Sequence, residues 1–103
     1  MRRYTTTTQT MTVEGADLTG CDVHVTYKQG SKLLKKRADS TSFDGEVSTV
    51  TVGFSQEETA FFKVGSAMVQ INWISPEGSR AATSQKPVMV EDNLLEEVIS
   101  FGE

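Results

Sequence analysis

The chain has few of the residues from which disulfides, metal centres and membrane spans are built. Its 103 residues include one cysteine, one histidine and two prolines, and no apolar run approaches the ~20 residues of a membrane-spanning helix. The single cysteine, Cys21, excludes an internal disulfide and a zinc site with several cysteine ligands, and it is compatible with folding in a reducing cytoplasm. We therefore expect one domain over residues 1–103 with a modest apolar core.

The chain also lacks a large excess of charge of one sign. Ten Lys and Arg stand against 14 Asp and Glu, so the net charge of −4 gives no general attraction for nucleic acid or for an anionic membrane. The chain begins with Arg2 and Arg3, but Tyr4 and the threonines at 5–8 stand where a signal peptide needs an apolar stretch. We expect no secretion signal, no nucleic-acid partner and no membrane partner.

What the sequence does contain most clearly is an alternation of apolar and polar residues over 67–74. The alternation runs into a turn that contains Pro76 and Gly78, which predicts a half-buried strand entering a hairpin. Trp73, the single tryptophan, lies on the inward row and is expected in the core. The apolar row is Ala67, Val69, Ile71 and Trp73.

Other segments have a similar alternation. It predicts strands over 9–14, 21–28 and 46–54, with a bulge near Ser48 where the phase of the last one is imperfect. A less regular strand is expected over 32–37, where basic residues protect a sheet edge. Two further strands are expected after the hairpin, at 80–83 and at 88–90, and the preceding Pro87 favours an edge or a strand break there.

One short helix is expected between the strands. Ser55 and Glu58 have the spacing of a capping box, and Gly65 is expected to end the helix and let the chain cross between sheets. Six or seven short strands with one helical crossover favour an all-β antiparallel sandwich, and a small barrel is the main alternative.

The last segment, residues 91–103, contains five acidic residues and no basic one. Its apolar residues occupy i, i+1, i+4 and i+5, which allows one face of a short helix. The segment either covers the core of its own domain or makes assembly contacts with another subunit. The candidate contacts are Leu94, Leu95, Val98 and Ile99.

We find no convincing catalytic or metal-binding pattern. Cys21 and His24 are three apart on a predicted strand, so their side chains point to opposite faces and do not form a dyad. The acidic residues at 39, 44 and 46 do not follow the spacing of a calcium-binding EF-hand loop. Glu57 and Glu58 are explained by helix capping. We therefore predict no enzyme, no cofactor and no metal.

Three segments together carry a family resemblance. The segments are Asp17-Leu18-Thr19-Gly20 followed by Val23, Val25 and Thr26, then Ser55-Gln56-Glu57-Glu58-Thr59, and then Val69 to Trp73 followed by Pro76-Glu77-Gly78. This pattern resembles small structural proteins of phages and prophages of Gram-positive bacteria, and over about residues 11 to 90 the chain is similar to the immunoglobulin-like N-terminal domain of phage baseplate upper proteins.

The resemblance implies an immunoglobulin-like sandwich in a virion, made in the cytoplasm of the bacterial host. It implies a non-enzymatic part in the tail, the baseplate or the head-to-tail region, with other virion subunits or further copies of the chain as partners. The alternative is a carbohydrate- or cell-surface-binding module that uses aromatic residues such as Trp73 and Tyr27. An enzyme is the third and weakest hypothesis.

Overall fold

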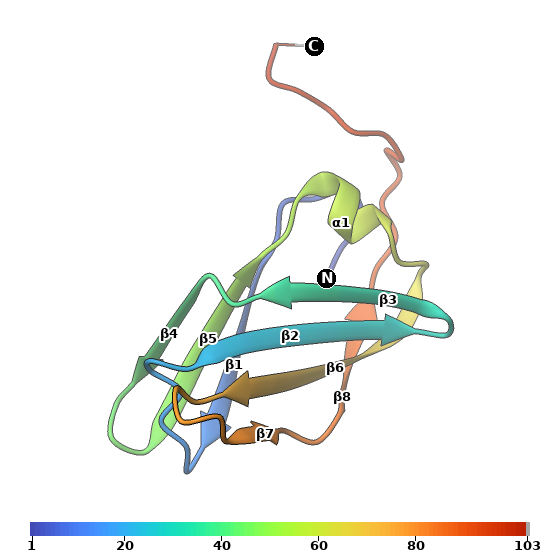
Figure 1. Ribbon diagram of the computed structural model, residues 1–103. Helices are drawn as coiled ribbons and strands as arrows, with labels where there is room; N and C mark the ends of the chain where they lie inside the picture. The colour runs from blue at the N-terminus through green and yellow to red at the C-terminus, as the bar shows by residue number, and fades with distance from the viewer. Residues whose placement is uncertain (103) are drawn as a thin grey trace.

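The structure is a computed structural model that describes residues 1–102, and it confirms the expected all-β sandwich. Eight strands form two separate antiparallel sheets rather than a closed barrel, and one short helix lies at one end (Figure 1). The elements are β1 (Thr8–Glu14), β2 (Asp22–Gln29), β3 (Lys32–Arg37), β4 (Ser40–Phe43), β5 (Val47–Gly53), α1 (Gln56–Ala60), β6 (Gly65–Ile74), β7 (Arg80–Ala82) and β8 (Lys86–Val90). No helix of the described residues is long and apolar enough to cross a membrane.

The smaller sheet has the order β1-β5-β4, and the larger sheet has the order β3-β2-β6 with β7 and β8 both paired to the far side of β6. The eighth strand, one more than the expected six or seven, is β4 (Ser40–Phe43), which pairs with β5 and lies between the strands predicted over 32–37 and 46–54. The two strands predicted after the hairpin both form, as β7 and β8, with an interruption between them. Between β7 and β8, Thr83 satisfies both backbone groups of Ile71 on β6. Its N–H donates to the Ile71 carbonyl at 2.9 Å, and its Oγ1 accepts from the Ile71 N–H at 3.1 Å. Pro87 lies on the outer edge, as its missing N–H requires.

The core lies between the two sheets and is built mainly from the inward rows of β2, β5 and β6. Tyr27 is fully buried, and its ring meets Phe54 edge to face with centroids 5.1 Å apart. Trp73 packs against this core but is only partly buried, because it lies near the end of β6. The buried apolar residues are Val13, Leu18, Val23, Val25, Tyr27, Val50, Val52, Phe54, Phe62, Ala67, Ile71 and Val90.

The bulge expected near Ser48 does not form. The pairing of β5 with β1 runs without a break from Val47 to Gly53, and the phase looks irregular because a buried serine occupies an inward position. Ser48 Oγ accepts from the Leu18 N–H at 3.0 Å and donates to the Ala16 carbonyl at 2.6 Å. The serine therefore fixes the loop between β1 and β2 from inside the sandwich.

The capping box is confirmed, but the expected end of the helix is wrong. Ser55 Oγ accepts from the Glu58 N–H at 3.2 Å, and Glu58 Oε1 accepts from the Ser55 N–H at 2.9 Å. The helix ends at Ala60, not at Gly65, because the chain turns there and places Phe62 in the core with no exposed surface. Gly65 instead begins β6, where its φ of 133° suits glycine.

Candidate functional site

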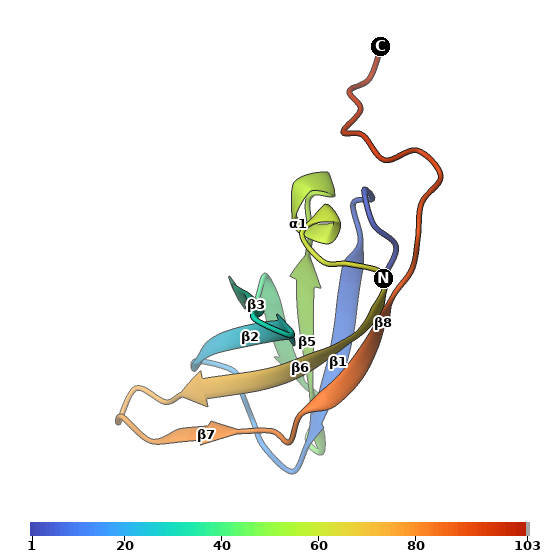
Figure 2. The ribbon, with the colours of Figure 1, turned by 90° about the vertical axis from the view of Figure 1, so that its right-hand side faces the viewer.

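The most exposed apolar side chains of the chain lie after β8, in the segment over residues 91–102 that we call the C-terminal tail. The buried core ends at Val90, and the tail rises from the end of β8 past α1 and away from the sandwich (Figures 1 and 2). Leu94 and Phe101 are fully exposed, at 102% and 108% of their reference surface. Leu95, Val98 and Ile99 are 48%, 46% and 52% exposed.

The short helix that the pattern over 91–103 allows is not formed over the described residues, 91–102. An isolated helix of this length is marginal in water, because most helical stability in proteins comes from packing an apolar face. Leu94 and Phe101 find no such surface on this domain, and Leu95, Val98 and Ile99 are only about half covered.

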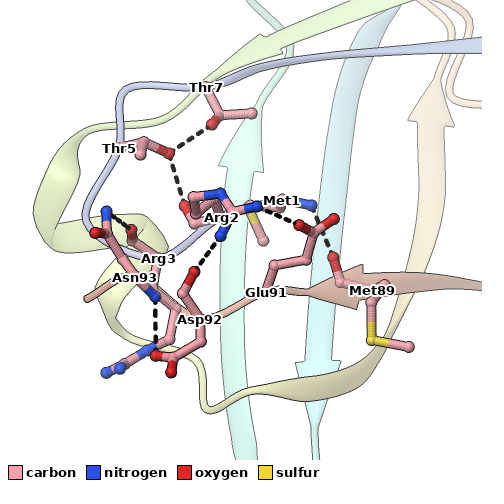
Figure 3. A network of polar contacts seen from close by, with 9 residues as sticks. All are labelled: Met1, Arg2, Arg3, Thr5, Thr7, Met89, Glu91, Asp92 and Asn93. Atoms are coloured by element: carbon pink, nitrogen blue, oxygen red, sulfur yellow. Dashed lines mark hydrogen bonds and ion pairs between the residues drawn. The ribbon is translucent and has the colours of Figure 1, made fainter. Parts of the chain in front are cut away.

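The base of the tail is held by an N-terminal arm, residues 1–7, whose first residues run parallel to the start of the tail (Figure 3). The Arg3 N–H donates to the Glu91 carbonyl at 3.0 Å, and the Arg2 guanidinium lies 2.7 Å from the Glu91 carboxylate. The Asn93 side-chain amide donates to the Arg3 carbonyl at 3.0 Å. These contacts fix the direction in which the tail leaves the domain.

The arm is in turn fixed to α1. The Arg3 guanidinium donates to the Phe62 carbonyl at 2.7 Å and to the Ala60 carbonyl at 3.2 Å, just beyond the helix and at its end. The buried Thr59 Oγ1 accepts from the Thr5 N–H at 3.0 Å and donates to the Thr5 carbonyl at 2.8 Å. The helix, the arm and the base of the tail therefore form one connected polar network.

Further along, the tail touches the domain through polar groups. The Gln56 side chain donates to the Ile99 carbonyl at 2.8 Å and accepts from the Ile99 N–H at 2.9 Å. Glu96 lies 3.3 Å from Arg3, with its side chain 57% exposed. These contacts use polar groups, and they leave Leu95, Val98 and Ile99 about half exposed.

The structure separates the basic cluster over 32–37 into two sets. Lys36 turns inward, where Nζ lies 2.7 Å from the Glu58 carboxylate and 5.1 Å from the centre of the Phe54 ring. Burial acts to raise the pKa of Glu58, but Lys36 and the Ser55 N–H outweigh it, so this pKa is lowered. Lys35 and Arg37 point outward from the same edge strand.

The residues tested for catalysis and metal binding are not brought together. His24 lies on the outward row of β2, while Cys21 precedes that strand and packs partly against the core. The Asp44 carboxylate accepts from the backbone N–H groups of Val47 and Glu46, which lowers its pKa. Among residues 1–102 we find no cluster of three or more His, Cys, Asp or Glu residues that could hold a metal.

A groove of about 480 Å³ opens between the unpaired edge of β1 and the break between β7 and β8. Met11 and Trp73 contribute apolar surface to it, and Thr12, Thr83 and Ser84 contribute hydroxyl groups. The groove is where the partly exposed Trp73 could meet a ligand.

No family model, no characterised protein and no solved structure matches the chain. The function is therefore inferred from the chain's own residues.

Proposed function

We propose that the chain is a non-enzymatic structural subunit whose sandwich is a rigid module and whose C-terminal tail docks on a neighbouring subunit. The observation that carries this proposal is the contrast at Val90: the core is complete before the tail begins, yet the tail holds five large apolar residues that are all at least 46% exposed. Exposed apolar side chains gathered in one short segment favour a role in protein association. The candidate contacts are Leu94, Leu95, Val98 and Ile99.

The neighbouring subunit, in this proposal, belongs to a phage or prophage virion, in the tail, the baseplate or the head-to-tail region. The sequence resemblance supports this placement, and the strand order supports its immunoglobulin-like part. The orders β1-β5-β4 and β3-β2-β6-β8 have the pairing of strands B-E-D and C′-C-F-G of immunoglobulin domains. The helix α1 occupies the crossover between the strands that correspond to E and F.

Removal of residues 94–103 tests whether the tail serves docking or folding. This truncation keeps Glu91 and Asn93, which hold the arm, and it removes the exposed apolar residues. We expect a folded monomer whose free energy of unfolding changes by less than about 1 kcal/mol, because only surface polar contacts are lost. Sedimentation velocity should show that the association of the full chain is abolished.

The matched control for chain length is a full-length variant with four substitutions, and it should lose association in the same way. The substitutions are Leu94→Ser, Leu95→Ser, Val98→Ser and Ile99→Ser. An unfolded truncated chain would assign the tail to the core instead. Association that survives both changes would also refute the proposed role of the tail.

The alternative function, a carbohydrate- or cell-surface-binding module, is favoured by one observation: Trp73 lines the groove beside the hydroxyl groups of Thr83 and Ser84. An aromatic face next to polar groups suits a sugar ring. Binding on a glycan array that disappears in a folded Trp73→Leu variant would favour this function over assembly.

A further inference from the structure

One face of the larger sheet carries four of the ten basic residues of the chain. The registers place Lys28, Lys35, Arg37 and Arg80 on the outward rows of β2, β3 and β7, and Asp22 is the one acidic residue on those rows. We call this surface the outer basic face.

The lysines of the outer basic face are available for a partner. Arg37 lies 3.4 Å from Asp22, and Arg80 donates to the Asn72 side chain at 3.3 Å. Lys28 and Lys35 are exposed, and neither forms an ion pair with a residue in the described part of the chain. Their charges are therefore open to an acidic ligand.

The outer basic face also has apolar surface and two shallow hollows. Leu33 is 58% exposed and lies in register with Lys28, which in turn pairs with Met68 on β6. A hollow of about 130 Å³ lies beside Leu33 and Met68, and one of about 250 Å³ lies beside Lys35 and Arg80. Outward faces of antiparallel sheets are normally polar, and here Leu33 and Ile74, at 58% and 38% exposed, add apolar surface beside the basic residues.

The C-terminal tail has the complementary composition. Its acidic residues are interleaved with apolar ones, with Glu96 and Glu97 between Leu95 and Val98, and residues 91–103 contain five acidic residues and no basic one. A segment that is both acidic and apolar matches a face that is both basic and apolar, which sets the partner and the orientation of docking.

The tail cannot lie on the outer basic face of its own chain without losing its contacts. Asn93 and Glu96 are held by Arg3, and Ile99 is held by Gln56 at the end of the domain that carries α1. In both ribbon views the tail runs away from β2 and β3 (Figures 1 and 2). A second copy can present its face to this tail while the base of the tail stays fixed.

We infer that the C-terminal tail of one copy docks on the outer basic face of a second copy. Glu97 meets Lys28 and Lys35 while Glu96 keeps its contact with Arg3, and the apolar residues of the tail cover Leu33 and the two hollows. This inference rests on the proposed function and names the partner of the tail as the chain itself.

Charge reversal in the full-length chain tests the inference by sedimentation velocity. Lys28→Glu with Lys35→Glu should weaken self-association at least tenfold, because two attractive contacts become repulsive. Adding Glu97→Lys to the same chain should recover about threefold of the lost association, and it leaves the contact of Glu96 with Arg3 in place. Raising the ionic strength from about 0.05 M to about 0.5 M should weaken association of the unchanged chain.

The matched control is Lys63→Glu with Lys86→Glu, two exposed lysines that lie off the outer basic face and carry the same charge change. This control should leave association within about twofold. Fluorescence of Trp73 checks that each variant is folded. If the charge-reversal variant is not folded, Lys28→Gln with Lys35→Gln is used in its place.

Three results would overturn the inference. The first is association that is unchanged by reversal at Lys28 and Lys35 although truncation abolishes it, since the tail would then dock elsewhere and the proposed function would stand. The second is a larger effect of the Lys63 and Lys86 control. The third is a full-length chain that stays monomeric at about 1 mM, which would leave the tail to a different subunit.

Discussion

Replacing Thr59 with valine should loosen the N-terminal arm and, through it, the base of the C-terminal tail. Thr59 is fully buried, and its hydroxyl makes two hydrogen bonds with the backbone of Thr5, at 3.0 Å and 2.8 Å. Valine keeps the shape of the side chain and removes both bonds. The hydroxyl is one of two links between the arm and α1, and the other, from the Arg3 guanidinium to the Ala60 carbonyl, stays in place.

The expected cost follows from these two bonds. Each contributes about 1 kcal/mol net, and water recovers part of the loss because Thr5 is only partly buried. The added methyl group returns less than about 0.8 kcal/mol. We therefore expect a net destabilisation of about 1–2 kcal/mol, which lowers the melting temperature of a domain of this size by about 10 °C.

Urea unfolding followed by the fluorescence of Trp73 measures the change in free energy, and hydrogen exchange locates it. The amide of Thr5 should lose protection in the variant, and so should the amide of Glu91, which donates to the Met1 carbonyl at 2.7 Å. Thr12→Val on the exposed row of β1 is the control and should stay within about 0.5 kcal/mol. Unchanged stability together with a protected Thr5 amide would refute the link.

Two further predictions concern buried and titrating groups. Tyr27→Phe should raise the free energy of unfolding by about 1 kcal/mol, because the buried Tyr27 hydroxyl has no hydrogen-bond partner within residues 1–102; calorimetry that shows a loss of stability would contradict this. The lowered pKa of Glu58 means that its contribution is present above its ordinary value of 4.5 and is lost as the pH falls through the folded value. Glu58→Gln should therefore lower the free energy of unfolding by roughly 1 kcal/mol at pH 7. Between pH 4.5 and about pH 3 the variant should lose less stability than the unchanged chain does. Urea midpoints of the two chains that fall in parallel over that range would refute this prediction.

The sequence was sufficient for the elements whose signals are local. Alternation placed β2 and β6 within two residues of their observed bounds, because the two faces of each strand meet different environments. The Ser55 and Glu58 pair identified the start of α1, since a capping box involves residues only three apart. These signals do not depend on where the rest of the chain lies.

The predictions that were wrong concern features that depend on tertiary contacts. Ser48 is polar yet buried, because the loop carrying Ala16 and Leu18 supplies its partners from another part of the chain. The helix stops before Gly65 because the chain turns to bury Phe62 in the core. Neither partner is visible in the local pattern, so a bulge and a longer helix were the natural interpretations.

The candidate site was predictable in part. The spacing of the apolar residues of the tail, including Leu94 and Val98, identified them as candidates, and the structure shows that they are exposed. The pattern does not predict the outer basic face, because protection of a sheet edge already explains the basic residues over 32–37. The available signal was position within the strands: Lys35 and Arg37 lie on the outward row, and pairing with β2 brings Lys28 beside them.

A tail that docks on the outer basic face makes a contact between two different surfaces of the same chain. The tail leaves the domain beside α1, whereas Lys28 and Lys35 lie on the flank of the larger sheet, so the contact is not self-complementary (Figure 1). Such a head-to-tail contact closes into a ring, of which two copies that exchange tails are the smallest, or it continues as a filament with one tail and one face unused at its ends, according to the rotation between copies. Because Arg3 and Asn93 fix the base of the tail, that rotation is set by the arm as well as by the interface. Substitutions in the arm should therefore change the geometry of the assembly, whereas substitutions at Lys28 and Lys35 should change its affinity.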